Sequence, residues 1–178
     1  MNIVLFSCSL HLQSRSFVLA QAAAEMLRNH GVEPRLYDLR QLDLPLCGPP
    51  SATEASDTQK MIQVVRDADA ILMAVPVYNF YANASAKNLI ELTGRAWTDK
   101  IVGFLCAAGG QRSYMSVMNM ANSLMLDFRC LVVPRFVYAV GDDFGDDRLE
   151  TMYISSPQVK ERIEQLTSET VRLTKALA

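Results

Sequence analysis

The 178-residue chain lacks an excess of charge of either sign. Its 17 Lys and Arg residues stand against 19 Asp and Glu residues, which leaves a formal net charge of −2. Proteins that bind nucleic acid or an anionic membrane surface through electrostatics carry an excess of basic residues, so neither partner is expected here. A bound anion would therefore have to be held by a local group of donors.

The chain also lacks a hydrophobic run of membrane-spanning length. No window of the sequence approaches the roughly 18 apolar residues that a helix needs to cross a bilayer. The N-terminal region has no basic segment followed by a long apolar stretch and a small-residue cleavage site, so no secretory signal is expected. Together these features predict a cytoplasmic protein.

Closely spaced cysteine pairs are missing as well. Cys8, Cys47, Cys106 and Cys130 are far apart in the sequence and form no CxxC motif, which argues against a zinc site or dithiol redox chemistry. The acidic segment 141–150 has no His or Cys nearby, and we expect it to be a solvated turn. No metal site is predicted.

Apolar segments alternate with helical patterns along the chain. The expected strands cover residues 3–6, 35–39, 70–75, 101–108 and 130–140. The expected helices cover residues 17–30, 57–67, 85–97, 113–128 and 157–177, with a long loop at 42–56. This alternation predicts one α/β domain over residues 1–178, in which a five-stranded parallel sheet lies between helices on both faces.

Two of these elements have informative details. Pro134 removes a backbone donor, which places the fifth strand at an edge of the sheet. The expected helix 113–128 has an apolar stripe and further apolar residues outside it, which indicate a partner surface. The stripe consists of Tyr114, Val117, Met118, Ala121, Leu124, Met125 and Phe128. The residues outside it are Met115, Met120 and Leu126.

The segment after the first strand is rich in hydrogen-bond donors. It reads SCSLHLQSRS over residues 7–16 and leads directly into a helix. Since the first turn of a helix has unpaired N–H groups and a partial positive charge, hydroxyls, a histidine and an arginine at that point favour a phosphate site. Serine as a helix cap explains only one or two of the four serines.

Two more unusual loops follow later strands. Residues 76–84 contain Tyr78, Phe80 and Tyr81, and the turn at 107–112 contains Gly109 and Gly110. Because the carboxyl ends of parallel strands meet at one edge of a sheet, all three loops are expected to lie together. A phosphate site beside aromatic residues and an open glycine turn describes a mononucleotide site, and FMN in particular.

Three motifs in this order resemble the NADPH-dependent FMN reductase family. They are Ser9-x-His11-x-x-Ser14-Arg15-Ser16, then Pro76-Val77-Tyr78-Asn79 with a downstream Ser85-Ala86-Lys87-Asn88, and then Ala108-Gly109-Gly110. Within the family, the motifs resemble in particular those of reductases that supply flavin to two-component sulfonate monooxygenases. It implies a flavodoxin-like fold, a doubly wound three-layer α/β/α sandwich with strand order 2-1-3-4-5.

The resemblance also implies the site residues. Ser9, His11, Ser14, Arg15 and Ser16 would hold the FMN phosphate; Pro76, Val77, Tyr78 and Asn79 would line the isoalloxazine; Ala108, Gly109 and Gly110 would meet its edge. The flavin carries the chemistry, so no catalytic side chain is assigned. The implied activity is hydride transfer from NADPH or NADH to FMN and on to free flavin, a quinone or a similar acceptor. The implied partners are the nucleotides, a second or further copies in a homodimer or homotetramer, and a flavin-dependent monooxygenase.

The chain departs from the family pattern at four positions. Cys8 stands where the family often has Gly, and His11 where it often has Arg, which removes one permanent cation from the phosphate site. Phe80 and Tyr81 replace the small residues that usually follow the Asn of the second motif, here Asn79. Their larger side chains would affect the access of a substrate to the isoalloxazine ring. Arg112 is expected to be exposed, where it could meet a phosphate of the nicotinamide dinucleotide.

Three alternatives were weighed on the residues. A low-molecular-weight phosphatase would use Cys8 as nucleophile, but six residues rather than five separate it from Arg15. A response-regulator receiver would need acidic residues where Ser7, Cys8 and Pro76 stand, and is excluded. A flavodoxin-type electron carrier stays open, although Arg15 and His11 are unlike the usual Thr- and Gly-rich phosphate loop of such proteins.

Overall fold

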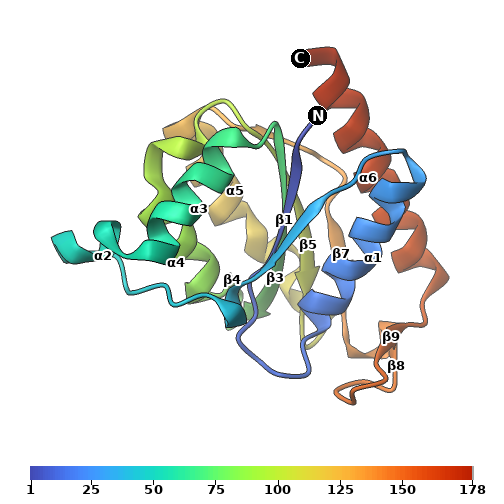
Figure 1. Ribbon diagram of the computed structural model, residues 1–178. Helices are drawn as coiled ribbons and strands as arrows, with labels where there is room; N and C mark the ends of the chain where they lie inside the picture. Colours follow the sequence, from blue (N-terminus) through green and yellow to red (C-terminus); the bar gives the residue numbers. More distant parts are fainter. Residues whose placement is uncertain (178) are drawn as a thin grey trace.

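The computed structural model describes residues 1–177 and places a mainly parallel sheet between two layers of helices (Figure 1). The sheet order is β2-β1-β3-β5-β6, with β7 also parallel to β5 and β4 antiparallel to β3. Its strands are β1 (Ile3–Ser7), β2 (Arg35–Asp38), β3 (Ala70–Tyr78), β4 (Tyr81–Ala82), β5 (Ile101–Ala107), β6 (Leu131–Val132) and β7 (Val137–Ala139). The expected order is confirmed, with β6 and β7 together forming the fifth strand.

The helices follow the expected alternation. They are α1 (Arg15–Asn29), α2 (Pro50–Glu54), α3 (Ser56–Asp67), α4 (Ala84–Thr93), α5 (Met118–Phe128) and α6 (Pro157–Leu177). Four 3-10 turns are η1 (Leu39–Gln41), η2 (Gly94–Trp97), η3 (Gln111–Val117) and η4 (Gly141–Asp143). A separate hairpin pairs β8 (Phe144–Gly145) with β9 (Tyr153–Ile154). The expected loop 42–56 thus contains α2, which protrudes at the left of Figure 1.

Each central strand is buried on both faces, as its unbroken apolar sequence predicts. Successive side chains alternate between the two faces of a strand, so Val4 and Phe6 lie in a core with α3, α4 and α5. Ile3 and Leu5 lie in a second core with α1 and α6. The two helix layers are on opposite sides of the sheet in Figure 1. Two cores on one sheet are what a doubly wound α/β fold requires.

The fifth strand is interrupted at Pro134. β6 pairs with Ile101 and Val102 of β5, and β7 pairs with residues 105–107, so residues 133–136 bulge out of the ladder between them. Proline has no N–H to donate, which explains a break at this point of an edge strand. The bulge brings Arg135 and Phe136 to the surface beside β7.

The expected core face of helix 113–128 is partly wrong. The segment begins as the 3-10 turn η3 and becomes α-helical only at Met118. Because a 3-10 turn has three residues per turn rather than 3.6, it shifts which residues face inward. Met120, assigned outside the stripe, is 6 % exposed, whereas Met118 is 41 % exposed. The half-exposed residues from the expected stripe are Tyr114, Met118 and Met125.

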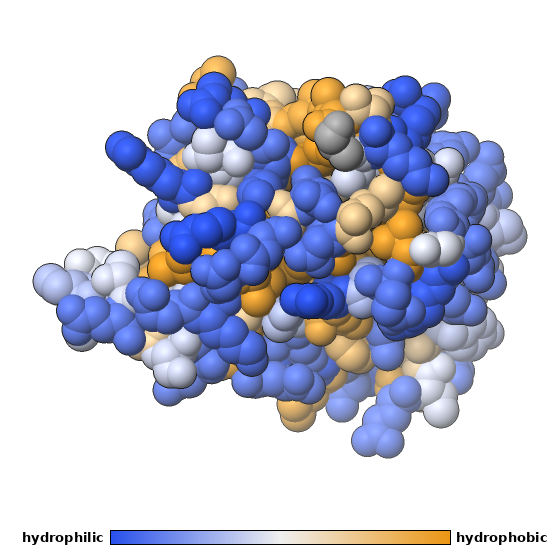
Figure 2. Space-filling model, turned by 45° about the horizontal axis from the view of Figure 1, so that its top comes forward, coloured by the Kyte–Doolittle hydropathy of each residue, from blue (hydrophilic) through white to orange (hydrophobic). Residues whose placement is uncertain are grey.

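Over the described residues 1–177, no helix combines the length and the apolar character needed to cross a bilayer. Figure 2 brings the top of Figure 1 forward, which is the edge where β1 begins. Hydrophilic residues cover most of that face, with smaller hydrophobic areas between them.

Candidate functional site

The segments that follow β1, β3 and β5 meet at the carboxyl edge of the sheet, at the bottom of Figure 1. Asn83, at the start of α4, donates from Nδ2 to the carbonyl oxygen of Cys8 at 2.6 Å. Arg15, at the start of α1, donates from Nη1 to the carbonyl oxygen of Ala108 at 3.0 Å. Residues from all three expected loops are therefore joined directly.

The carbonyl groups of the loop between β1 and α1 are held by two arginines. Arg40 donates from Nη1 to Leu12 O at 2.6 Å, and Arg148 donates from Nη1 to Gln13 O at 2.7 Å. In a planar trans peptide the N–H points opposite to the C=O. The N–H group of Ser14 therefore faces away from Arg148, whereas the N–H group of Gln13 donates to His11 Nδ1 at 3.1 Å. N–H groups that point out of a loop in this way can bind an anion.

The serines of this loop are buried hydroxyls. Ser14 caps α1 by accepting a hydrogen bond from Phe17 N at 3.1 Å, and Ser9 Oγ accepts one from His11 N at 3.2 Å. Ser16 Oγ is buried and has no hydrogen-bond partner within the described chain. The same holds for Ser7 Oγ and for Asn83 Oδ1 at the same edge of the sheet. A buried polar atom left unpaired costs about 1–3 kcal/mol, so its presence here fits a ligand site.

Arg15 forms an ion pair with Asp147 from the acidic segment 141–150. Its Nε and Nη2 atoms donate to the two carboxylate oxygens at 2.7 and 2.5 Å. The hydrogen bond from Arg15 and its charge lower the pKa of Asp147, and the pKa of Arg15 is raised in turn. With Nη1 on Ala108 O, three of the five guanidinium N–H groups are engaged and two are free to meet an anion.

The expectation that segment 141–150 is only a solvated turn is therefore wrong. The chain around β8 and β9 supplies Asp147 and Arg148, and both contact the loop between β1 and α1. More than 130 residues separate the partners, so no local pattern could reveal the pairing. The alternation of Gly and Asp indicates a turn but not its target.

The second expected loop is the end of a strand followed by a hairpin. β3 continues through Pro76 and Val77 to Tyr78, then turns at Asn79 and Phe80 into β4. Both turn residues have positive φ, at 50° and 64°, as the tight two-residue hairpin turn of type I′ requires. The strand thus runs three residues beyond its expected end. The hairpin holds Tyr78, Phe80 and Tyr81 at 50–63 % exposure, so these aromatic side chains do not pack in the core.

A cavity of about 760 Å³ lies between this hairpin and the glycine turn, and we call it the ring cavity. Residues 77–80 line one side and residues 109–113 the other. A Cβ atom added to Gly109 or Gly110 would meet nothing within 4 Å. Gly110 has extended backbone angles (φ −169°, ψ 174°) that any residue adopts. The glycines are therefore not required by a tight turn, and they leave open the space in front of them.

The remaining predicted residues lie around these groups. Pro76 and Ala108 are in the strand ends beneath the ring cavity and do not line it. His11 is exposed, and its Nδ1 accepts a hydrogen bond from Gln13 N at 3.1 Å. It borders a separate leucine-lined cavity of about 530 Å³ between the β1–α1 loop and the segment after β2. The motifs missed four contributors, namely Gln111 and Ser113 at the ring cavity and Asp147 and Arg148 at the β1–α1 loop.

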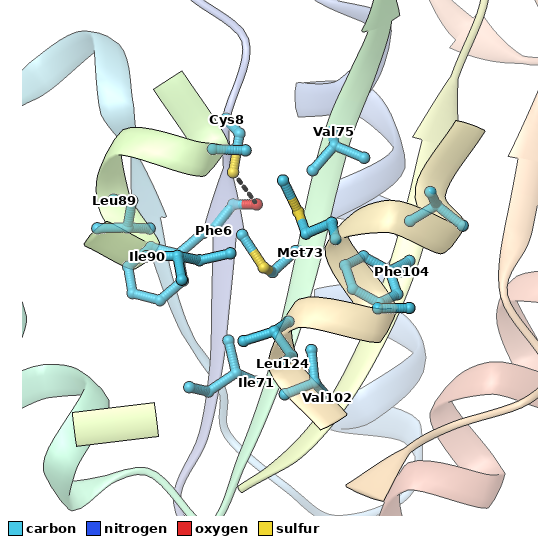
Figure 3. Close-up of a cluster of buried hydrophobic side chains, with 14 of the residues drawn as sticks. Phe6, Cys8, Ile71, Met73, Val75, Leu89, Ile90, Val102, Phe104 and Leu124 are labelled. Carbon is cyan, nitrogen blue, oxygen red and sulfur yellow. Dashed lines mark hydrogen bonds between the residues drawn. The ribbon is translucent and has the colours of Figure 1, made fainter. Parts of the chain in front are cut away.

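Cys8 is part of the hydrophobic core (Figure 3). Its side chain is 0 % exposed, and Sγ lies 3.8 Å from the carbonyl oxygen of Phe6. Burial raises the pKa of the thiol far above its ordinary range, because the thiolate would lose its hydration. A phosphatase mechanism needs this thiolate exposed to the substrate, and the structure buries the thiol instead.

Comparisons with known proteins identify the family and the fold. The family model for NADPH-dependent FMN reductase matches residues 1–145. An NAD(P)H-dependent FAD/FMN reductase of Geobacillus thermodenitrificans is 31% identical over 144 residues, covering 80% of this chain and 76% of that protein. The NADH-dependent FMN reductase SfnF of Pseudomonas fluorescens is 28% identical over 166 residues, with 92% and 86% covered.

Among solved structures, the flavoenzyme NAD(P)H:(acceptor) oxidoreductase FerB of Paracoccus denitrificans superposes with a TM-score of 0.79. Its sequence is 14% identical, and the match covers 98% of this chain and 97% of that one. At this identity the likeness concerns the fold.

Proposed function

The chain belongs to the NADPH-dependent FMN reductase family, and from that premise we propose that the three segments at the carboxyl edge of its sheet hold FMN. The protein is an NAD(P)H-dependent FMN reductase with FMN and a nicotinamide nucleotide as its cofactors. The observation that carries the placement is the contact of Arg15 with Ala108 O. This hydrogen bond holds the loop between β1 and α1 beside the glycine turn at the carboxyl edge of the sheet.

We assign the phosphate of FMN to the loop between β1 and α1. Ser9, Ser14 and Ser16 contribute hydroxyls, and the first turn of α1 contributes N–H groups and a partial positive charge. Arg15 contributes its two free N–H groups, which carry a permanent charge. His11 is the exposed member of the set. The unpaired hydroxyl of Ser16 supports this assignment.

We assign the isoalloxazine to the ring cavity. Val77, Tyr78 and Asn79 form one wall, and Gly109 and Gly110 form the other with no side chains in the way. Behind them, Pro76 is paired with Ala107 in the parallel register of β3 and β5, and Ala108 N donates to Ala139 O at 2.8 Å. A wall that is free of side chains leaves room for a flat ring, which supports the assignment.

Bound FMN supplies hydride and electron transfer between the nicotinamide nucleotide and free flavin, a quinone or a similar acceptor. The side chains of this chain bind and orient the nucleotides. Hydrogen bonds hold two segments of the site in place before the nucleotides bind. Arg15, Arg40 and Arg148 anchor the loop between β1 and α1. In the glycine turn, Tyr138 Oη donates to Gly110 O at 2.5 Å. Such preorganisation lowers the entropy cost of binding.

The absorbance spectrum of the purified protein with and without added FMN tests the placement. We expect flavin absorbance bands or quenching of FMN fluorescence on titration, and steady-state oxidation of NAD(P)H when an acceptor is present. A protein that binds FMN but oxidises no nicotinamide nucleotide would instead be an electron carrier of the flavodoxin type. Neither flavin bands nor quenching would remove FMN from this site.

We also propose a homodimer or homotetramer whose contacts lie near the ring cavity. Phe80 and Tyr81 on the hairpin and Met115 and Met118 on η3 and α5 are 41–63 % exposed, and η3 packs directly against β4. Exposed aromatic and methionine side chains of this kind are typical of interfaces. Their burial by a second copy would also cover one side of the flavin.

Sedimentation velocity at micromolar concentration checks the assembly. The wild-type protein is expected to sediment as a dimer or tetramer, and Met115→Glu is expected to shift it to the monomer because a charge would be buried. Leu46→Glu is the matched control, because it changes an apolar side chain on the segment after β2 that is even more exposed (78 %, against 61 % for Met115), and it should leave the assembly unchanged. A wild-type monomer would contradict the proposal.

The remaining assignments are proposals of the same kind. Residues 1–178 form one flavin-binding domain, and a flavin-dependent monooxygenase is the partner that the family resemblance suggests. The four cysteines are free in the structure, three of them buried, which supports a reducing compartment such as the cytoplasm.

A further inference from the structure

A second cavity, which we call the arginine cavity, adjoins the ring cavity. It has a volume of about 470 Å³ and lies between η3, the bulge before β7 and the first turns of α6. Gln111, next to the glycine turn, lines both cavities. The two cavities are therefore neighbours, with Gln111 between them. Its volume is within the range of about 300–1,000 Å³ that ligand pockets occupy.

Two arginines in its wall have no acidic partner. Within the described residues, neither Arg135 nor Arg162 has a carboxylate oxygen within 4 Å. Arg135 is exposed in the bulge made by Pro134, and Arg162 is half-buried on α6. The N-terminal end of α6 adds a partial positive charge, since the helix begins at Pro157 beside the same cavity. Guanidinium groups in this setting are suited to a phosphate monoester.

The carboxylates nearest these arginines have other partners. Asp143 accepts a hydrogen bond from Val140 N at 2.8 Å, and Glu161 accepts one from Gln165 Nε2 at 3.0 Å. Glu169, whose charge interacts with that of Arg135, is paired with Arg172 at 2.6 Å. The acidic groups around the cavity are thus held in place, and neither guanidinium is neutralised by a direct contact.

An aromatic surface completes the cavity. Tyr114 packs against Phe136 with ring centroids 4.8 Å apart, and against Tyr138 at 5.3 Å. Tyr114 is 45 % exposed, so part of its ring is available for stacking. A purine base stacks on such a surface because each of its faces is a flat π-system. Aromatic rings beside unpaired arginines match an adenine that carries a phosphate nearby.

We propose that the arginine cavity is the subsite for the 2′-phosphoadenosine end of NADPH, which makes Arg135 and Arg162 the residues that select NADPH over NADH. The proposal rests on the function proposed above, because it places the nicotinamide at the flavin in the ring cavity. The dinucleotide then passes Gln111 and Arg112, where its pyrophosphate lies beside the Arg112 cation, and its adenine stacks on Tyr114. NADH has no 2′-phosphate for the two arginines.

Steady-state kinetics of the FMN-loaded enzyme with each nucleotide test the selection. We expect a preference for NADPH in kcat/KM. Arg135→Gln and Arg162→Gln should each raise KM for NADPH about tenfold, the loss of one charge-assisted contact, with kcat and the KM for NADH unchanged. Arg66→Gln is the matched control, since this arginine is exposed on α3 and lines neither cavity. Equal use of NADH and NADPH by the wild type, or variants with unchanged KM, would overturn the proposal.

Calorimetric titration of the FMN-free protein with adenosine 2′,5′-bisphosphate gives a second readout that does not depend on turnover. Binding is expected for the wild type and for Arg66→Gln, and loss of binding is expected for the Arg135→Gln/Arg162→Gln double variant. Adenosine 5′-monophosphate should bind to the wild type more weakly than the bisphosphate does. In the double variant, this difference between the two nucleotides should disappear. Absence of bisphosphate binding to the wild type would overturn the subsite. Absence of NAD(P)H oxidation despite bisphosphate binding would instead overturn the function proposed above.

Discussion

Replacing Arg15 by glutamine is expected to weaken FMN binding by about 100-fold or more. Arg15 joins three segments of the site, since it contacts both carboxylate oxygens of Asp147 and the carbonyl of Ala108 from the first turn of α1. The Arg15 side chain is 14% exposed, and that of Asp147 is 30% exposed. A hydrogen bond to a charged group contributes about 1.5–3 kcal/mol, so loss of two such bonds from Arg15 to the phosphate would cost about 3 kcal/mol or more, and each 1.4 kcal/mol is a factor of ten in affinity. Quenching of FMN fluorescence on titration measures the affinity.

Asp147→Asn separates the two roles of Arg15. The variant keeps the shape of the side chain and removes its charge, so it releases the guanidinium while leaving Arg15 present. If Arg15 must be held in place to bind the phosphate, affinity falls about tenfold, because one charge-assisted contact is lost. Glu150→Gln, an exposed position in the same segment, is the control and should bind FMN as the wild type does. Tighter binding by Asp147→Asn would show that the carboxylate competes with the phosphate instead.

The same pair predicts a pH dependence with a definite sign. The hydrogen bond and charge of Arg15 lower the pKa of Asp147 in the folded protein below the value of about 3.9 of an unfolded chain. A carboxylate with a lowered pKa contributes stability above its unfolded pKa and loses it as pH falls through the folded value. The ion pair is therefore intact from pH 5 to pH 8 and is lost only below about pH 4. In an acid-unfolding experiment, Asp147→Asn should therefore not show the loss of stability that protonation of Asp147 causes in the wild type.

Gly110→Val is expected to abolish FMN binding, by more than about 100-fold, with little change in thermal stability. An added Cβ at this position meets no protein atom within 4 Å, and the extended backbone suits a β-branched residue. The protein therefore tolerates the side chain, but its methyl groups would project into the space in front of the glycine turn, where we place the flavin. The loss of affinity is expected to be large because the valine side chain would occupy space that the isoalloxazine needs.

Absorbance titration with FMN and a thermal melt together measure this prediction. Gly103→Ala is the contrasting control, because its Cβ would lie 2.6 Å from Leu72 Cδ2 and 3.0 Å from Leu166 Cδ1 in the packed core. That variant should lower the melting temperature, since the core has no room for the methyl group. Gly110→Val protein that binds FMN with unchanged affinity would remove the glycine turn from the flavin site.

The sheet and its helices were predictable because their signals are local. The unbroken apolar segments 3–6, 70–75 and 101–108 are typical of strands covered on both faces, and the helical patterns between them favour parallel crossovers. Pro134 correctly marked the edge strand. The hairpin at Asn79 and Phe80 was missed because neither residue is a glycine, although both adopt positive φ. The inward face of residues 113–128 was misplaced because the 3-10 turn is not visible in the spacing of apolar residues.

The sequence by itself determined the α/β architecture, the family and the three segments that carry the site motifs. Each depends on residue types at short spacing, and parallel strands necessarily bring the segments after them to one edge. Only the tertiary structure decided that Asp147 holds Arg15, that Cys8 is sealed in the core, and that Gly109 and Gly110 face open space. It also decided that Arg135, Arg162 and Tyr114 enclose one cavity. These contacts join residues far apart in the chain, and their geometry is set by packing of whole elements, which no local pattern encodes.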